Sequence, residues 1–226
     1  MSKQLLKFTI ILLSLTVFTC KNDSVTFNNY KYIDQENILV CELVNTQLYF
    51  EALLSFEDDI SNRYDPEHKN IRRGYSAFTR DALNKTLNFQ DIVSPHTMEI
   101  FEVLKNDTDL WHSNNTLNYN SKLLTCIGDN LKNEGLKTTF KALVSTHSMR
   151  PDIFGAPLTT QVKNAHQDRY MAAYVAFDLF YANLFDIDPT KVIENKRNLS
   201  DATHKSKSKS TPEVFKKIKA QESTNK

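Results

Sequence analysis

The stretch STHSMRPDIFGAP, residues 145–157, places three polar side chains around a rigid proline turn. His147, Arg150 and Asp152 supply an imidazole, a guanidinium and a carboxylate, and loops held by rigid elements often carry such binding residues. The plainer interpretation is that Arg150 and Asp152 pair with each other and cap neighbouring helix ends. The pattern therefore predicts either a ligand or partner site or a local ion pair, and it gives none of these residues a catalytic role.

A second candidate is the acid that interrupts the apolar run YMAAYVAFDLFYANLF. Asp178 could be buried there with a shifted pKa, which is typical of functional sites. The alternatives are that it lies on the one solvent-exposed face of the helix or that it bonds to a tyrosine hydroxyl, because Tyr174 and Tyr181 are near by helical spacing. His166 and Arg169 stand at the start of the same run and could point toward the end of the molecule that carries the 145–157 loop.

No pattern for a catalytic centre, a cofactor or a metal site is present in the sequence. The chain lacks HExxH, G-x-S-x-G and G-x-G-x-x-G, and its four glycines leave no room for a Gly-rich phosphate cradle. Thiolate zinc sites need clustered cysteines, and di-iron bundles need paired Glu-x-x-His motifs. The sequence has neither pattern. We therefore expect no catalytic residue, no metal and no cofactor.

The N-terminus has the form of a secretory signal over residues 1–19. Lys3 and Lys7 make a positive start, and the apolar run that follows is shorter than the roughly 20 residues that a membrane span needs. The residues VFTC, ending at Cys20, resemble the lipobox of bacterial lipoproteins. The residues CKND resemble the charged export tag of some surface lipoproteins. The resemblance implies a mature protein that begins at Cys20 and is held in the membrane, favouring the outer membrane, by diacylglycerol and palmitate.

Cysteine parity agrees with that interpretation. If Cys20 carries lipid, Cys41 and Cys126 remain as an even pair able to form a disulfide in an oxidising compartment. The alternative is that both are small buried apolar residues.

Charge divides the chain into an acidic body and a basic tail. Residues 189–226 hold ten Lys/Arg against four Asp/Glu, whereas residues 20–188 hold 16 against 23. The Lys-Ser repeat of the tail is typical of a disordered segment. We expect a signal peptide at 1–19, a flexible tether at 20–35, a helical domain at 36–188 and a disordered tail at 189–226.

Apolar spacing predicts an all-α domain, a single bundle of about six helices. Repeats at threes and fours, with proline and capping residues as start signals, give these helices. They run over 36–62, from Asp65-Pro66 to about 82, from Ser94-Pro95 to about 104, over 121–133 with Gly135 as the stop, over 136–149, and from about 158 to 187. The last should be the central helix because it is apolar nearly all round. A Cys41–Cys126 bond would then join the first helix to the fourth.

These observations favour an exported, lipid-anchored envelope protein that acts by binding or scaffolding, with the membrane and an envelope protein as partners and no nucleic acid. The alternatives are a secreted helical domain that carries a small molecule, or a hydrolase. A carrier should have an enclosed pocket with a few convergent polar groups, for which Asp178, Arg169 and His147 are the candidates.

Overall fold

The computed structural model describes residues 26–37, 39–43 and 45–192, and they form an all-α domain. The helices are α2 (Thr46–Tyr64), α3 (Ile71–Leu83), α4 (Pro95–Leu104), α5 (Lys122–Asn130), α6 (Glu134–Ser145), α7 (Pro151–Gln161) and α8 (Arg169–Tyr174). The domain also contains the 3₁₀ helices η1 (Phe89–Asp91), η2 (Val162–Gln167) and η4 (Tyr181–Asn183), and the π-helix η3 (Val175–Phe180). The predicted helical bundle is confirmed. The leader, Cys20 and residues 193–226 of the tail lie outside the described residues.

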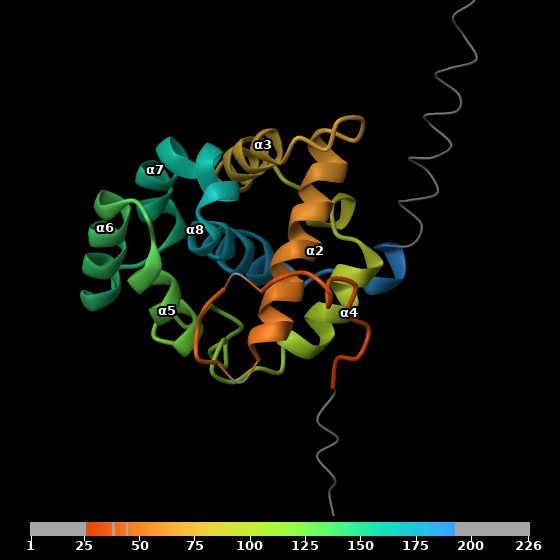
Figure 1. Ribbon diagram of the computed structural model, residues 1–226, viewed down its shortest axis with the longest axis horizontal. Coiled ribbons are helices and arrows are strands. Elements are labelled where there is room, and N and C mark those ends of the chain that lie inside the picture. The colour runs from red at the N-terminus through yellow and green to blue at the C-terminus, as the bar shows by residue number, and fades with distance from the viewer. Residues whose placement is uncertain (1–25, 38, 44, 193–226) are drawn as a thin grey trace, which may run out of the picture.

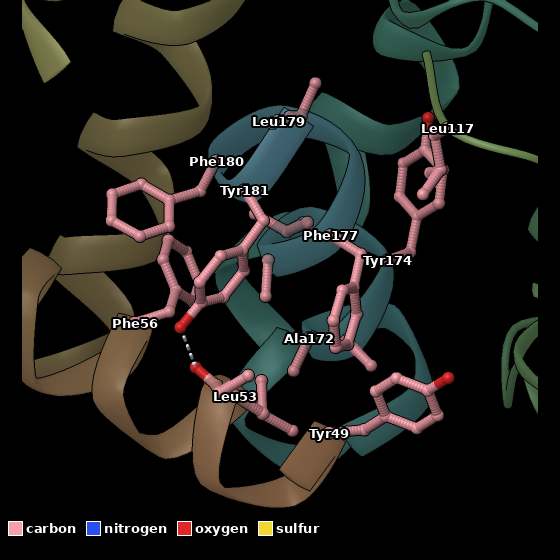
Figure 2. Packing of buried hydrophobic residues seen from close by; sticks show 14 of the residues in the cluster. Tyr49, Leu53, Phe56, Leu117, Ala172, Tyr174, Phe177, Leu179, Phe180 and Tyr181 are labelled. Atoms are coloured by element: carbon pink, nitrogen blue, oxygen red, sulfur yellow. Dashed lines mark hydrogen bonds between the residues drawn. The ribbon is translucent and has the colours of Figure 1, made fainter. Parts of the chain in front are cut away.

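The segment from α8 to η4 is the centre of the bundle, as its apolar sequence predicts. Every residue from 171 to 181 is buried. Figure 1 shows this segment between α2, α3 and α4 on one side and α5, α6 and α7 on the other. Figure 2 shows aromatic rings of the segment facing α2, where Phe180 lies 5.1 Å from Phe56 between ring centroids. The Tyr181 hydroxyl donates to the carbonyl of Ala52 over 2.9 Å, which ties the same two elements together.

Two of the predicted helix starts depend on local capping, and they are confirmed. Ser94 accepts a hydrogen bond from the Thr97 backbone at the start of α4, and Ser121 accepts one from Leu124 at the start of α5. Arg150 is extended because it precedes Pro151, but the helix that follows, α7, begins at Pro151 and not near residue 158 as predicted, since proline is favoured in the first turn of a helix.

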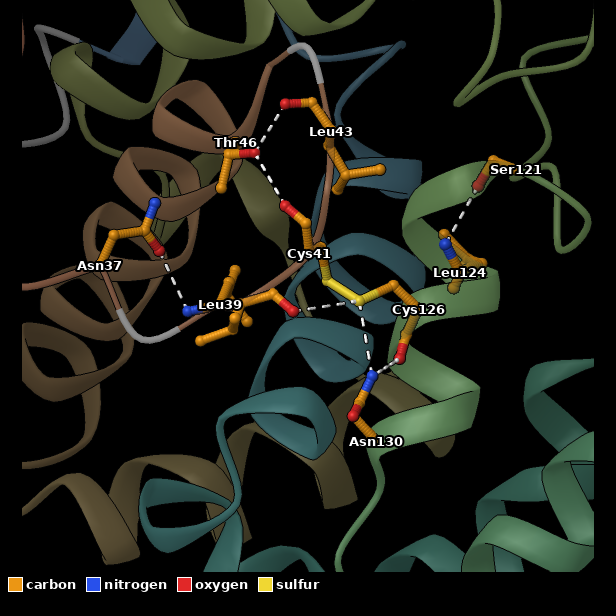
Figure 3. The surroundings of a disulfide bond; sticks show 10 residues. Asn37, Leu39, Cys41, Leu43, Thr46, Ser121, Leu124, Cys126 and Asn130 are labelled. Atoms are coloured by element: carbon orange, nitrogen blue, oxygen red, sulfur yellow. Dashed lines mark hydrogen bonds between the residues drawn. A yellow bond between two sulfur atoms is a disulfide. The ribbon is translucent and has the colours of Figure 1, made fainter.

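The first helix begins later than predicted, at Thr46 rather than Glu36. In residues 39–43 the backbone instead makes two successive tight turns. The N–H of Cys41 donates to the Leu39 carbonyl, and the N–H of Leu43 donates to the Cys41 carbonyl. Thr46 donates its hydroxyl to the Leu43 carbonyl (2.8 Å), and the Cys41–Cys126 disulfide holds the segment on α5 (Figure 3). The bond therefore joins the segment before the first helix, not the helix itself, to α5.

The Asp65-Pro66 pair closes α2 instead of opening the next helix. The backbone N–H of Asp65 bonds the Ser61 carbonyl, and its carboxylate accepts from the His68 backbone. The N-cap of α3 is Asn70, which accepts from the Arg73 backbone over 3.2 Å. The Asp-Pro signal is ambiguous because an aspartate can stabilise a turn as well as a helix start.

The later helices also differ from the prediction at their ends. α5 ends at Asn130, and Gly135 is inside α6, whose N-cap is Asn133. The predicted helix from 158 to 187 is broken, since η2 follows α7 and Asp168 caps α8 afresh by accepting from the Met171 backbone. The Asp168 carboxylate also accepts from the backbone N–H of Lys132. The loop between α5 and α6 therefore stabilises the break.

The N-terminal segment belongs to the packed domain from residue 26. Phe27 and Tyr32 are buried, and the fully buried carboxylate of Glu51 on α2 accepts from the backbones of Lys31 (2.7 Å) and Tyr32 (3.1 Å). Residues 26–35, which the sequence assigns to a tether, therefore lie against α2. We call residues 26–43 without 38 the N-terminal strap.

Candidate functional site

A hollow of about 540 Å³ opens between α3, the loop after it, the start of α7 and the π-helix η3. We call it the Asp178 hollow, and its lining is Ala82, Leu83, Lys85, Leu87, Phe89, Arg150, Pro151, Asp152, Asp178, Leu179 and Asn183. Six of the eleven lining residues are apolar, and the other five are polar. Ligand sites of small molecules have this size.

Asp178 is the buried polar group of this wall, with 3% of its surface exposed. Its carboxylate accepts from the hydroxyl of Tyr174 (2.5 Å) and from that of Tyr119 (2.7 Å). Burial raises the pKa of Asp178 to about 6, although the two tyrosine hydrogen bonds lower it. The predicted bond to Tyr174 is confirmed, whereas Tyr181 bonds to Ala52 instead.

The backbone around Asp178 is a π-helix, which is rare and is found often at functional sites. The extra residue of such a turn changes which side chains face outward. Here the residues on both sides of Asp178 stay buried, and Phe180 packs on Phe89 of the opposite wall with ring centroids 6.2 Å apart.

The rim of the hollow carries an ion pair. Arg150 donates two hydrogen bonds to Asp152, and both side chains are exposed. These bonds, joined by the charge of Lys85, lower the pKa of Asp152. This is the local ion pair that the sequence offered as the plainer interpretation, and it lies at the mouth of the hollow that Asp178 lines.

Lys85 is held at this rim by an unusual backbone conformation. Its φ of 55° is in the left-handed region, which is costly for a residue other than glycine. The backbone N–H of Lys85 bonds the Ala82 carbonyl over 3.0 Å, so the end of α3 fixes the turn.

No cation among the described residues is paired with Asp178. The ion pairs of the described part of the chain involve other carboxylates, and the groups that act on the pKa of Asp178 are the two tyrosines. A charged carboxylate without a countercharge is costly to bury. The Asp178 carboxyl group therefore lines the hollow without a paired cation, and the guanidinium of Arg150 at the same hollow is paired with Asp152.

The remaining sequence candidates lie elsewhere. Arg169 is paired with Glu57 in a different cleft, which His166 also lines. His147, with a left-handed φ of 53°, lines a cavity of about 190 Å³ together with Tyr119. The structure thus brings Arg150, Asp152 and Asp178 together, and it separates them from Arg169 and His147.

Sequence reasoning missed two residues of the site. Tyr119 stands in an irregular Asn-rich loop, where no periodicity assigns it a partner, and Lys85 follows α3 without a motif. The positively charged loop residue after a helix was the weak signal for Lys85. For Tyr119 the sequence carries none.

The described residues contain no group of three His, Cys, Asp or Glu side chains that could hold a metal ion. Within the same residues no helix has both the length and the apolar character to cross a membrane. No protein-family model matches the sequence, and neither the curated proteins nor the solved structures contain a match.

Proposed function

We propose that this protein is an exported, lipid-anchored binding protein of a bacterial envelope. Its Asp178 hollow would take a small ligand with an apolar body and a cationic amine. The observation that carries the ligand class is the buried carboxylate of Asp178, which lines the hollow without a paired cation.

The geometry supports an amine for a simple reason. Each oxygen of Asp178 accepts one tyrosine hydrogen bond, and a carboxylate has about four acceptor positions, so further donors can be accommodated. An ammonium group would supply both the donor and the missing positive charge. The apolar wall formed by Leu83, Leu87 and Phe89 would contact the rest of the ligand.

Export is supported by two independent features. The first 19 residues have the form of a secretory signal, and the disulfide between Cys41 and Cys126 suits an oxidising compartment. Because that bond uses two of the three cysteines, Cys20 has no cysteine of the same chain left to pair with. Lipidation at Cys20 would use that remaining thiol.

The ligand class can be tested with butylamine as the probe and with butanol and butyrate as neutral and anionic matches. We expect saturable chemical-shift changes of the full-length protein with butylamine, weaker ones with butanol and none with butyrate. Asp178→Asn should weaken butylamine binding at least tenfold, whereas Asp129→Asn, at an exposed carboxylate paired with Lys141 on the surface, should not. Equal binding of butylamine by both variants, or preference for butyrate, would overturn the proposal.

The anchor is tested by the intact mass of the protein from its native membrane fraction. We expect a species that starts at Cys20 with added acyl mass, and its loss in a Cys20→Ala variant. A lipid-free species that starts at another residue would contradict the anchor and indicate a secreted protein. That outcome would leave the proposed ligand site unaffected.

A further inference from the structure

A second cleft, of about 730 Å³, lies between the C-terminal half of α2, the loop before α3 and the junction of η2 with α8. We call it the Lys69 cleft, and it shares no lining residue with the Asp178 hollow. Its wall is polar. Three cations, Lys31, Lys69 and Arg169, line it against two carboxylates, Glu57 and Asp58.

Both carboxylates are already occupied by donors of the protein. Glu57 accepts both terminal nitrogens of Arg169 and the hydroxyl of Tyr75 (2.7 Å). Asp58 accepts the ammonium of Lys31 (2.6 Å) and the hydroxyl of Tyr32 (2.5 Å). Both oxygens of Glu57 and Oδ2 of Asp58 therefore already accept hydrogen bonds from the protein.

Donors, in contrast, remain. Lys69 donates to a neutral acceptor, the side-chain oxygen of Asn62. Among the described residues four buried side-chain atoms have no hydrogen-bond partner, and two of them, Nδ1 of His166 and Nε of Arg169, belong to residues that line this cleft. Buried polar atoms are normally paired, so two unpaired ones at one cleft indicate a wall that the protein alone does not satisfy.

The position of Lys69 is fixed by its backbone. Its φ of 52° is left-handed, its N–H bonds the Asp65 carbonyl over 2.8 Å, and the next residue, Asn70, caps α3. A lysine held in a strained conformation at the mouth of a cleft fits a binding role, since strained backbone is concentrated at such sites.

We propose that the Lys69 cleft binds the oxyanion group of a small molecule, a carboxylate or a phosphate, with Lys69 as its main cationic contact. The excess of one positive charge and the remaining donors favour an anion. Arg169 is held at the cleft by its ion pair with Glu57, and Lys31 is held there by its ion pair with Asp58. This site is independent of the proposed amine site.

The test is a titration of the full-length protein with inorganic phosphate and with succinate at constant ionic strength, followed by backbone chemical shifts. We expect saturable binding of one or both anions. Lys69→Gln should weaken it at least tenfold, and Lys69→Arg, which keeps the charge, should stay within about threefold of the original protein. Lys141→Gln removes the same charge from a lysine paired with Asp129 on the α5–α6 surface, and it should leave binding unchanged.

The anion that binds more tightly identifies the source of the oxyanion group. The absence of saturable binding of either anion would overturn the proposal. So would equal weakening by Lys69→Gln and Lys141→Gln, because that result would show a response to net charge only. Asp178→Asn should not change anion binding, so this experiment fails or succeeds separately from the amine test.

Discussion

Tyr119 donates its hydroxyl to Oδ1 of Asp178 over 2.7 Å, although 59 positions separate the two residues. Tyr119 also lines the small cavity of His147, so one side chain forms part of that cavity and bonds the acid of the Asp178 hollow. The loop that carries Tyr119 is fixed on both sides. The Asn118 backbone donates to the Leu110 carbonyl over 2.9 Å, and the Ser121 backbone donates to that of Asn118 over the same distance.

Removal of this hydroxyl should raise the pKa of Asp178 above about 6, because the Tyr119 hydrogen bond lowers it. We expect Tyr119→Phe to shift the titration of the Asp178 carboxyl carbon, measured by NMR, toward higher pH. Tyr64→Phe removes a hydroxyl that bonds Asp81 instead, and it should leave the titration of Asp178 in place. An unchanged midpoint in Tyr119→Phe would show that the bond does not stabilise the charged acid.

Asp178→Asn should change the pH dependence of stability with a defined sign. The folded pKa of about 6 is above the ordinary value of 3.8, so the folded protein binds the proton more tightly, and its free energy of unfolding falls as pH rises from about 4 to 6. Two pKa units correspond to about 3 kcal/mol. The original protein should therefore lose up to about 3 kcal/mol of unfolding free energy between pH 4 and pH 7 through Asp178. The variant lacks this loss, so the difference in unfolding free energy, variant minus original, should rise by up to the same amount.

Urea denaturation of both proteins at several pH values measures this difference. A difference in unfolding free energy that stays constant from pH 4 to pH 7 would show that Asp178 titrates normally in the folded protein.

Loss of the disulfide should destabilise the protein substantially. Cys41 and Cys126 are 85 positions apart, and closing a loop of that length restricts the unfolded chain by about 4–5 kcal/mol in the chain-entropy account. We expect the double variant Cys41→Ser/Cys126→Ser to lose about 2–5 kcal/mol in urea denaturation under non-reducing conditions. Stability within about 0.5 kcal/mol of the original protein would show that the N-terminal strap is held by its other contacts.

Gly128 should not tolerate a methyl group. A Cβ at this position of α5 would lie 2.6 Å from Cε1 of Phe140, and that ring is itself packed against Phe154 (5.6 Å) and Tyr174 (5.7 Å). We expect Gly128→Ala to lower the free energy of unfolding by about 1–3 kcal/mol.

The matched control is Gly135→Ala in α6, where the nearest atom would be Oδ1 of Asn133 at 3.4 Å. That variant should be neutral or more stable by up to about 1 kcal/mol, because alanine favours helix. Equal effects of the two substitutions in thermal or urea denaturation would contradict the packing argument.

The features that the sequence predicts are those that depend on neighbouring residues. Ser94 and Ser121 start helices because their side chains cap backbone groups three residues later, and the Tyr174–Asp178 bond follows from one turn of helix. The Cys41–Cys126 pair, 85 positions apart, is the exception, because the parity of the cysteines predicts it.

The features that the sequence missed depend on distant residues. Leu39 and Leu43 have helical spacing with the residues of α2, yet their segment is held outside the helix by a bond to α5. The pair between Arg169 and Glu57 joins residues 112 positions apart, and no local pattern records it. The same limit applies to the Asp178 hollow and the Lys69 cleft, since each is formed by side chains from elements that only tertiary packing brings together.

The pairing of Cys41 with Cys126 also imposes an order in time. A chain grows from its N-terminus at roughly 5–20 residues per second, so Cys126 follows Cys41 by about 4–17 s for the 85 positions between them. Throughout that interval Cys126, the partner of Cys41, has not yet been synthesised. The N-terminal strap is therefore among the first parts of the domain to be synthesised, and its covalent attachment waits until α2, α3 and α4 have all followed.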